Sequence, residues 1–490
     1  MRIVVVGAGS AGCVVAARLS EDGDREVVLL EAGPDRAGTE TGRLLASASW
    51  IDAMSAADAF DPGLMATRLA ADAPRPYLRG RGLGGSGSVN AMLALPGLPR
   101  DYDGWATRYG LDEWAWASVE PTFAGLREQL AVTARADYTP VDRALVEAAA
   151  SLGLPDDVDT FTPADGAGTL RRTADATGRR SSLETCLEPA RGRANLTIRP
   201  DARVDRLAVD DDVVVGVVLT DGTELAADVV VLCAGAIETP AILLRSGCAR
   251  PGVGRNLQDH PAASILLALE PGSREVVPGG PCVNAVLRLS SSVESGDIHL
   301  LAMQGALSAT TPQHHGALMA ALMTATSTGE VRLDPDDPAG PPLVAVRMLS
   351  TARDRQVMRE AVQHALAVLE TPPFRAIVES AFVDATGTPA AALADPEVYE
   401  AWLNASLGNY VHATGTARMG RAEDPGAVVD QRGRVHGWSG VRVIDCSIMP
   451  EVPAANTHLP VVMVAERLSA ALRSDLAAGP RAGRPEATTP

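Results

Sequence analysis

Short apolar runs, most of them rich in β-branched residues, predict the strands of a buried parallel sheet. Because such strands are covered on both faces, they appear in a sequence as continuous rather than alternating apolar runs. The first two enclose an Ala-rich helix over residues 11–19, which is the order of a dinucleotide-binding βαβ unit. The runs assigned to this sheet lie far apart along the chain, at residues 3–6, 27–30, 229–232 and 441–445.

The middle of the chain, residues 262–410, mixes strand-like runs with one amphipathic helix over residues 356–370. The apolar positions of that helix fall near helical spacing at Val357, Ala361, Val362, Ala365 and Leu369. The strand-like runs cover residues 264–269, 285–289, 298–303 and 343–348. We therefore expect an α+β region that is distinct from the opening fold.

Polar turns and prolines mark the ends of further elements. Residues 220–223, Thr-Asp-Gly-Thr, separate two apolar runs and predict a β-hairpin. Proline is tolerated in the first turn of a helix, because the N–H groups there have no partner within the helix. We therefore expect one helix with Pro240 in its first turn, and a terminal helix over residues 459–476 with Pro460 in the same place.

The first strand ends in the spacing GxGxxG, at Gly7, Gly9 and Gly12. Such glycines allow a tight turn, a close approach of the backbone to a pyrophosphate, and close packing of helix on strand. The helix that follows directs the positive end of its dipole at the phosphates. Glu31 ends the second strand, where a carboxylate can accept the hydroxyls of an adenosine ribose. The sequence thus predicts a site for an ADP-containing dinucleotide.

A second glycine-dense segment, residues 84–88, reads Gly-Gly-Ser-Gly-Ser. Each glycine in a helix interior costs about 1 kcal/mol, so this segment is expected to be a loop. Its amides could approach a flat or anionic ligand, or the segment could be a surface linker. The apolar residues at 89–94 favour a loop that lies under buried structure.

Composition and charge narrow the class of protein. The chain has 490 residues, 46% of them hydrophobic, and a formal net charge of −18, which disfavours nucleic acid and anionic membrane surfaces as partners. No apolar run reaches membrane-spanning length, and because the first predicted strand starts at residue 2 we expect no secretory signal. The six cysteines have no metal-ligand spacing. We expect a cytoplasmic protein with reduced thiols, no metal, and a disordered tail over residues 477–490.

Taken together, these motifs resemble the glucose–methanol–choline (GMC) oxidoreductase family of flavoproteins. The opening GAGSAG with Glu31 resembles its FAD site, and GRGLGGSGSVNAM, from residue 80, its first signature. GAIETPAILLRSG, from residue 235, resembles its second signature, and PGVGRNLQDHP follows at the usual place. Residues 424–469 resemble the carboxyl-terminal segment of the family that contacts the flavin. The similarity extends over nearly the whole chain.

The resemblance implies a set of site residues. Val89 occupies the position at which some members attach the flavin covalently to a histidine, so FAD is expected to be non-covalent. The catalytic pair would be His412 and His458, whereas His260 is expected to be structural. Asp445 would lie against the flavin, or would cap a helix or turn. The residues expected to bind the cofactor are Gly7, Gly9, Ser10, Ala11, Gly12, Glu31, Ala32, Arg81, Gly84, Gly85, Ser86, Asn90, Ala91, Met92, Val204, Ala234, Gly235, Asp445, Cys446, His458, Leu459 and Pro460.

The activity implied by the resemblance is oxidation of an alcohol to an aldehyde or ketone. A histidine would abstract the hydroxyl proton while hydride passes to flavin N5, and O₂ or another acceptor would reoxidise the flavin. Three alternatives are a dehydrogenase that passes electrons to a carrier, a hydroxynitrile lyase with a non-redox flavin, and a non-catalytic flavoprotein. The retained histidine pair disfavours the last of these.

The resemblance and the scattered strands together imply two interleaved domains. The expected fold is an α/β, Rossmann-like FAD-binding domain interleaved with an α+β substrate domain built on a largely antiparallel sheet. The FAD-binding domain is expected to comprise residues 1–100, 190–262 and 420–476. The substrate domain is expected to comprise residues 263–419, with residues 101–189 contributing mainly to it and to a lid.

Overall fold

The computed structural model describes residues 1–70, 72–276, 279–305 and 315–478. Its first sheet has five parallel strands in the order β11 (Leu196–Arg199), β2 (Glu26–Leu30), β1 (Arg2–Val6), β15 (Val229–Leu232) and β25 (Val441–Val443). Val4 of β1 lies in register with Val28 on one side and Val230 on the other. The predicted parallel sheet is therefore confirmed, including the pairing of strands more than 200 residues apart in the chain.

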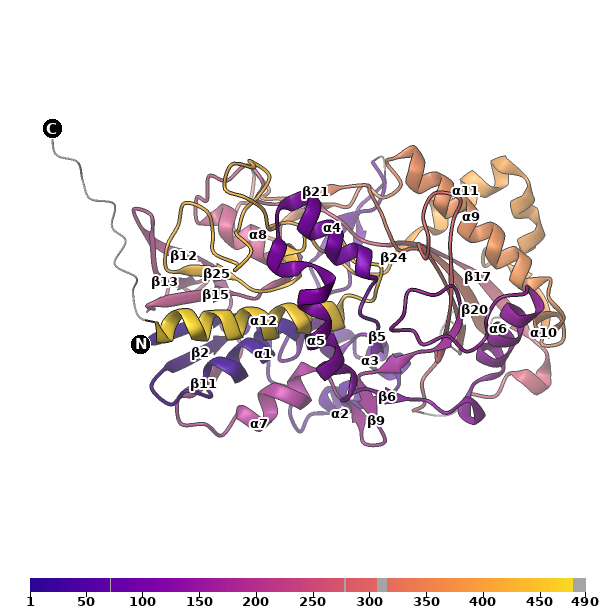
Figure 1. The fold of residues 1–490 in the computed structure, drawn as a ribbon, viewed down its shortest axis with the longest axis horizontal. Helices are drawn as coiled ribbons and strands as arrows, with labels where there is room; N and C mark the ends of the chain where they lie inside the picture. The colour runs from indigo at the N-terminus through magenta and orange to yellow at the C-terminus, as the bar shows by residue number, and fades with distance from the viewer. Residues whose placement is uncertain (71, 277–278, 306–314, 479–490) are drawn as a thin grey trace.

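Two helices cover one face of this sheet. α1 (Ser10–Leu19) packs against α12 (His458–Ala477), the yellow helix of Figure 1, and Arg18 of α1 forms an ion pair of 2.8 Å with Glu466 of α12. The predicted hairpin around residues 220–223 joins β13 (Val213–Leu219) and β14 (Glu224–Ala226). With β12 (Val204–Asp210), these strands form a small antiparallel sheet that packs into the same hydrophobic core.

The helix that contains Pro240 begins earlier than expected. α8 spans Gly235–Arg245, so Pro240 lies in its interior rather than in its first turn. Proline has no N–H to donate to the carbonyl four residues earlier, that of Ala236. The Thr416 hydroxyl donates to that carbonyl instead, at 2.7 Å. A side chain distant in sequence thus allows the helix to continue through Pro240.

The second large sheet is antiparallel, as expected. Its strands run in the order β23 (Val378–Phe382), β17 (Pro261–Leu269), β20 (Gly316–Leu322), β19 (Ile298–Gln304), β18 (Ala285–Leu289) and β7 (Gly166–Thr169), and β24 (Gly408–Asn409) also pairs with β17. The helices α6 (Pro140–Ser151), α9 (Ala352–Leu369) and α10 (Pro372–Arg375) lie on this side of the molecule (Figure 1). The predicted amphipathic helix is thus found, and it starts four residues earlier than expected.

Successive residues of these strands alternate between a helix-covered core and a cavity. Ile265, Leu267, Leu300 and Leu318 belong to the core shared with α6 and α9. Their neighbours in the chain point to the opposite face, where they line the cavity described below: Ser264, Leu266, Leu301, Met303 and Met319. Because both sets are apolar apart from Ser264, the sequence predicted strands here but not which face would line a cavity.

The aromatic segment after residue 100 packs with the parallel sheet. α4 (Pro99–Tyr109) and α5 (Trp116–Arg127) contribute Tyr102, Trp105 and Phe123 to the core around that sheet. Tyr102 contacts the rings of both Trp105 and Phe123. Residues 101–189 were expected to serve mainly the substrate side; α4 and α5 pack with the parallel sheet, whereas α6 and β7 belong to the core of the antiparallel sheet.

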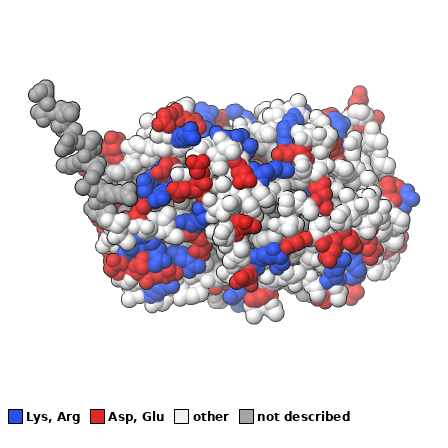
Figure 2. Space-filling model, in the orientation of Figure 1, with Lys and Arg blue, Asp and Glu red and all other residues white. Residues whose placement is uncertain are grey.

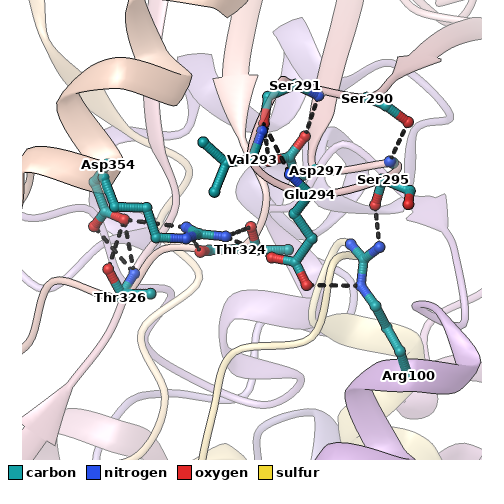
Figure 3. Close-up of polar contacts among 12 residues, drawn as sticks. Arg100, Ser290, Ser291, Val293, Glu294, Ser295, Asp297, Thr324, Thr326 and Asp354 are labelled. Carbon is teal, nitrogen blue, oxygen red and sulfur yellow. Dashed lines mark hydrogen bonds and ion pairs between the residues drawn. The ribbon is translucent and has the colours of Figure 1, made fainter.

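An ion-pair bridge connects the two cores. Glu294, between β18 and β19, lies 3.2 Å from the Arg100 guanidinium of α4 and 2.5 Å from that of Arg353 in α9. Figure 3 shows Arg100 reaching Glu294 and the carbonyl of Ser295 from the helix below. Asp354, next to Arg353, accepts hydrogen bonds from Thr326 and Ser327 and fixes the start of α9. We refer to Arg100, Glu294 and Arg353 as the bridge.

The surface has mixed charge. Acidic and basic side chains are interspersed over the face seen in Figure 2. No helix among the described residues is long and apolar enough to cross a membrane.

Candidate active site

A cavity of about 850 Å³ lies between the parallel sheet and the antiparallel sheet. On one side it meets residues that follow the carboxyl ends of the parallel strands: Gly7 after β1, Glu31 after β2, Ala234 after β15 and Asp445 after β25. Ligands of open α/β sheets bind at these strand ends. The position of the cavity therefore follows from the topology of the sheet.

Most of the residues expected at the cofactor or in catalysis line this one cavity. Those that do so are Gly7, Gly9, Ser10, Ala11, Glu31, Ala32, Arg81, Gly85, Ser86, Asn90, Ala91, Met92, Val204, Ala234, Gly235, His412, Asp445, Cys446 and His458. Val89 lines it as well.

Four of the expected cofactor residues do not line the cavity. Gly12 packs α1 on the first turn, where an added Cβ would lie 1.8 Å from the carbonyl oxygen of Gly7. Gly84 turns the chain at a positive φ of 89° and is likewise too close to Ser88 for a Cβ. Leu459 and Pro460 are buried in the first turn of α12. These four residues therefore pack behind the residues that line the cavity and fix the backbone of the site.

The turn between β1 and α1, which carries Gly7 and Gly9, can hold an anionic group. Gly9 precedes α1 with no side-chain cap, and no atom lies within 4 Å of the position of an added Cβ. The first amides of α1 therefore have no protein side chain at their end, which is the arrangement that binds phosphate. Beside it, the Glu31 carboxylate accepts from the amides of Ala8, Gly33 and Gly82 at 2.9 to 3.0 Å. A carboxylate has about four acceptor positions, so about one remains for a ribose hydroxyl.

Asp445 performs the capping role that the sequence left open. Its carboxylate accepts from the Gly235 amide at 2.8 Å and the Thr239 hydroxyl at 2.7 Å, in the first turns of α8. It also accepts from the Ser447 amide at 2.8 Å. The residue lines the cavity while its carboxylate joins the ends of β15 and β25 to α8.

A buried arginine holds the second glycine loop in place. Arg179 donates to the Asn90 side-chain oxygen at 2.7 Å, and to the carbonyls of Asn90 and Gly87. Met92, itself at a positive φ of 62°, donates its amide to the same Asn90 oxygen. The side-chain oxygen of Asn90 thus accepts two hydrogen bonds from the protein. Its NH₂ group is not used in these two bonds and can donate to a ligand in the cavity. Burial lowers the pKa of Arg179 to about 10.

His412 is held by contacts on several sides. Its amide donates to Asp259 at 2.8 Å, and its Nδ1 lies 2.9 Å from Nδ1 of His260. The Tyr410 ring stacks on the imidazole with the centroids 4.8 Å apart. Burial, reinforced by His260 and Arg79, lowers the pKa of His412 well below 6.5. The imidazole is therefore neutral near pH 7.

His458 is the first residue of α12. Its Nδ1 lies 3.0 Å from the Ser10 hydroxyl, at the start of α1. Burial, with a smaller contribution from the charge of Arg179, lowers its pKa to about 4. Both imidazoles are thus neutral groups that line the same cavity.

Sequence reasoning missed several residues of the site. Arg79, Tyr410 and the cavity face of the antiparallel sheet line the cavity, and Arg179 supports it. Tyr410 lies only two residues before His412, so an aromatic neighbour could have been suspected from the sequence. His260 was expected to be structural, but its contact with His412 was not expected, because the two residues are 152 positions apart in the chain.

A dinucleotide site that faces an apolar pocket with two neutral imidazoles suits an oxidoreductase that uses a dinucleotide cofactor such as FAD or NAD. Family models described as GMC oxidoreductase match residues 1–262 and 325–465. The chain belongs to the GMC oxidoreductase family.

Individual relatives cover nearly the whole chain. The 5-(hydroxymethyl)furfural oxidase of Methylovorus sp. (strain MP688) is 32% identical, over 96% of this chain and 98% of its own. The oxygen-dependent choline dehydrogenase of Paraburkholderia phymatum is 31% identical, over 96% and 92%. The crystal structure of pyridoxine 4-oxidase from Mesorbium loti has a TM-score of 0.82 at 28% identity, covering 96% of this chain and 99% of that one.

These findings establish the type of enzyme. The protein is an FAD-dependent oxidoreductase of alcohols with the GMC fold. The residues that would hold the FAD dinucleotide are those of the turn between β1 and α1, Glu31 and the loop carrying Asn90. The hydroxynitrile lyase alternative finds no support in the comparisons.

Proposed function

We propose that the enzyme oxidises an uncharged, largely apolar alcohol, with His412 as general base and His458 as hydrogen-bond donor to the substrate oxygen. The observation that carries this proposal is the shared cavity of two neutral imidazoles and one apolar sheet face. Bound FAD supplies the hydride acceptor.

The contacts of each imidazole support its role. His412 uses Nδ1 toward His260, and its Nε2 has no hydrogen-bond partner among the described residues. That nitrogen can take the hydroxyl proton. When the Ser10 hydroxyl donates to Nδ1 of His458, the proton of His458 lies on Nε2 and can be donated to the substrate oxygen. A base and a donor on one oxygen favour its developing negative charge.

The lining of the cavity supports an uncharged substrate. The antiparallel sheet contributes Leu301, Met303 and Met319, with Ser264 and Asn409 as its polar residues. The carboxylates on the wall are Glu31, Asp61, Glu238 and Asp445, and none belongs to that sheet. Glu238 and Asp61 both lie within 4.0 Å of Arg203, and Glu31 and Asp445 accept hydrogen bonds from backbone amides. Among the described residues, the wall therefore offers no unpaired carboxylate to a quaternary ammonium group.

Anaerobic mixing with alcohols tests the proposal. Benzyl alcohol and 1-hexanol should bleach the flavin absorbance, whereas choline at equal concentration should do so far more slowly. Aldehyde formation then measures turnover with O₂ and with an artificial dye, which separates an oxidase from a dehydrogenase. A clear preference for choline over every uncharged alcohol would overturn the substrate assignment.

We propose that FAD is held without a covalent bond, because Val89 offers no nucleophile. Acid precipitation should release all of the yellow colour into the supernatant. Flavin that stays with the pellet would contradict this.

The domain boundaries and the cellular location are also proposals. Residues 1–100, 190–262 and 420–476 would form the FAD-binding domain and residues 263–419 the substrate domain, with residues 101–189 contributing mainly to the latter and to a lid. The presence of two separate cores supports a division into two domains, and α4 and α5 join the first core. The six cysteines, all free, suit a reducing compartment such as the cytoplasm. Limited proteolysis of the holoenzyme and cell fractionation test these two points.

A further inference from the structure

The imidazole of His260 contacts that of His412, the proposed catalytic base. It immediately precedes β17, and its side chain is fully buried. Its Nδ1 lies 2.9 Å from Nδ1 of His412, and the two rings are perpendicular, with their centroids 5.2 Å apart. This is a hydrogen bond between two imidazoles, so one proton lies between the two nitrogens.

The backbone fixes this distance from both sides. A single oxygen of Asp259 accepts hydrogen bonds from the backbone amides of both His260 and His412, each at 2.8 Å. The other oxygen of Asp259 accepts from the Tyr77 hydroxyl at 2.7 Å. The Tyr410 amide donates to the carbonyl of His260 at 3.1 Å. One carboxylate and one short strand pairing therefore hold the two histidines together.

The residue before His412 is conformationally strained. Val411 has a φ of 57°, in the left-handed region, where a β-branched side chain is a genuine outlier. The Arg79 guanidinium donates to its carbonyl and holds this conformation. Such outliers persist where the surroundings fix them, and they cluster at functional sites.

The shared proton can lie on either ring, with opposite consequences. If His260 carries it, His412 accepts at Nδ1, its own proton is at Nε2, and it has no free lone pair for the substrate. If His412 carries it, its Nε2 is bare and can act as a base. In this second arrangement the proton of His260 lies on its Nε2.

The surroundings of His260 favour the second arrangement. The carbonyls of Met323 and Pro453 act on its ring as acceptors and oppose the effect of burial, which lowers its pKa to about 3. Nδ1 of His260 lies against His412, and its Nε2 makes no hydrogen bond of normal geometry among the described residues. Carbonyls accept but never donate, so carbonyls near this ring favour a protonated nitrogen, and with Nδ1 directed at His412 that nitrogen would be Nε2.

We propose that His260 is a positioning residue that accepts the Nδ1 proton of His412 and thereby leaves Nε2 of His412 free to act as the base. This rests on the proposed role of His412. When His412 takes a second proton from the substrate, the same hydrogen bond stabilises the charged ring. His260 itself neither touches substrate nor changes its protonation.

Two substitutions at residue 260 test the proposal by rate. His260→Leu removes the acceptor and should slow anaerobic flavin reduction by about 10- to 100-fold, the effect known for losing a group that orients a metal-ligating histidine. His260→Asn places a side-chain oxygen near the position of Nδ1 and should keep the rate within a few-fold of wild type. His299→Leu, which removes another buried imidazole, is the matched control and should leave the rate unchanged.

The tautomer itself gives a readout that a purely structural role would not change. Ring-¹⁵N histidine spectra of the holoenzyme, assigned by loss of the His412 signals in His412→Ala, should show Nε2 of His412 unprotonated at pH 7.5. In His260→Leu that preference should be lost, and flavin content checks the fold. A protonated Nε2 in wild type, or an unchanged rate in a folded His260→Leu, would overturn the proposal.

The two levels of the argument can fail separately. If His412→Ala reduces flavin at the wild-type rate, the proposed function is wrong. If His412→Ala is slow while His260→Leu keeps both the rate and the tautomer, only the role of His260 is wrong. Should His260→Leu fail to fold, the wild-type spectrum and His260→Asn still decide the question.

Discussion

Burial rather than ion pairing sets the protonation state of the imidazoles at this site. No carboxylate contacts the ring of His412 or His458 among the described residues, and for both rings burial is the main cause of the lowered pKa. A neutral imidazole can accept a proton and donate one at the same time through its two nitrogens. The pair is therefore ready to act at neutral pH without prior deprotonation.

The roles assigned to the two histidines predict unequal effects. A general base contributes about 10²- to 10⁴-fold in rate, so His412→Ala should slow anaerobic flavin reduction by that factor. His458→Asn should cost less, because an amide can still donate to the substrate oxygen. Stopped-flow reduction measures both rates, with bound flavin absorbance as the check on folding. Equal loss in both variants would contradict the division of roles.

The buried imidazole of His299 predicts a pH effect on stability. His299 is fully buried, and burial lowers its pKa well below 6.5. Below pH 6.5 the unfolded chain binds a proton there that the folded chain does not, so stability falls as the pH falls, by up to about 1.4 kcal/mol per pH unit. His299→Leu should remove this contribution. The thermal midpoint should then drop less between pH 7.5 and 5.5 in the variant than in wild type.

At the scale of elements, periodicity predicted which segments form strands and helices but not which face each would present. The buried runs of the parallel sheet were recognised because nothing interrupts them, and their ends located Gly7, Glu31 and Asp445. The cavity wall formed by Leu301, Met303 and Met319 was not predictable, because both faces of β19 and β20 are apolar.

The start of helix α8 was predicted too late in the chain for a different reason. The hydroxyl that satisfies its free carbonyl comes from Thr416, far along the chain.

That contact predicts the cost of one substitution. Thr416→Val keeps the shape of the side chain but leaves the buried carbonyl of Ala236 without a donor. An unsatisfied buried acceptor costs about 1 to 3 kcal/mol, and the thermal midpoint should fall accordingly. Thr416→Ser retains the hydroxyl and is the matched control. If the Val and Ser variants unfold at the same temperature, α8 does not depend on this bond.

At the scale of the whole molecule, two cores share one cavity and are joined by the bridge. Glu294 and its partners Arg100 and Arg353 are between 26% and 35% exposed, so water screens their interaction. Exposed pairs typically contribute about 1 kcal/mol or less. Glu294→Gln should therefore lower the thermal midpoint only slightly, and the difference from wild type should shrink in 0.5 M NaCl. A large loss that is independent of salt would mean that the bridge acts through packing.

The order of strands in the parallel sheet has a consequence for how the protein is made. β15 lies between β1, from the first residues, and β25, from near the end of the described chain, and α12 covers α1. A ribosome adds about 5 to 20 residues each second, so the amino-terminal strands wait tens of seconds for their last neighbours. Sheets whose strands come from distant parts of the chain also form slowly. A chain stopped after residue 440 should remain sensitive to protease and fail to retain FAD, whereas one stopped after residue 478 should fold.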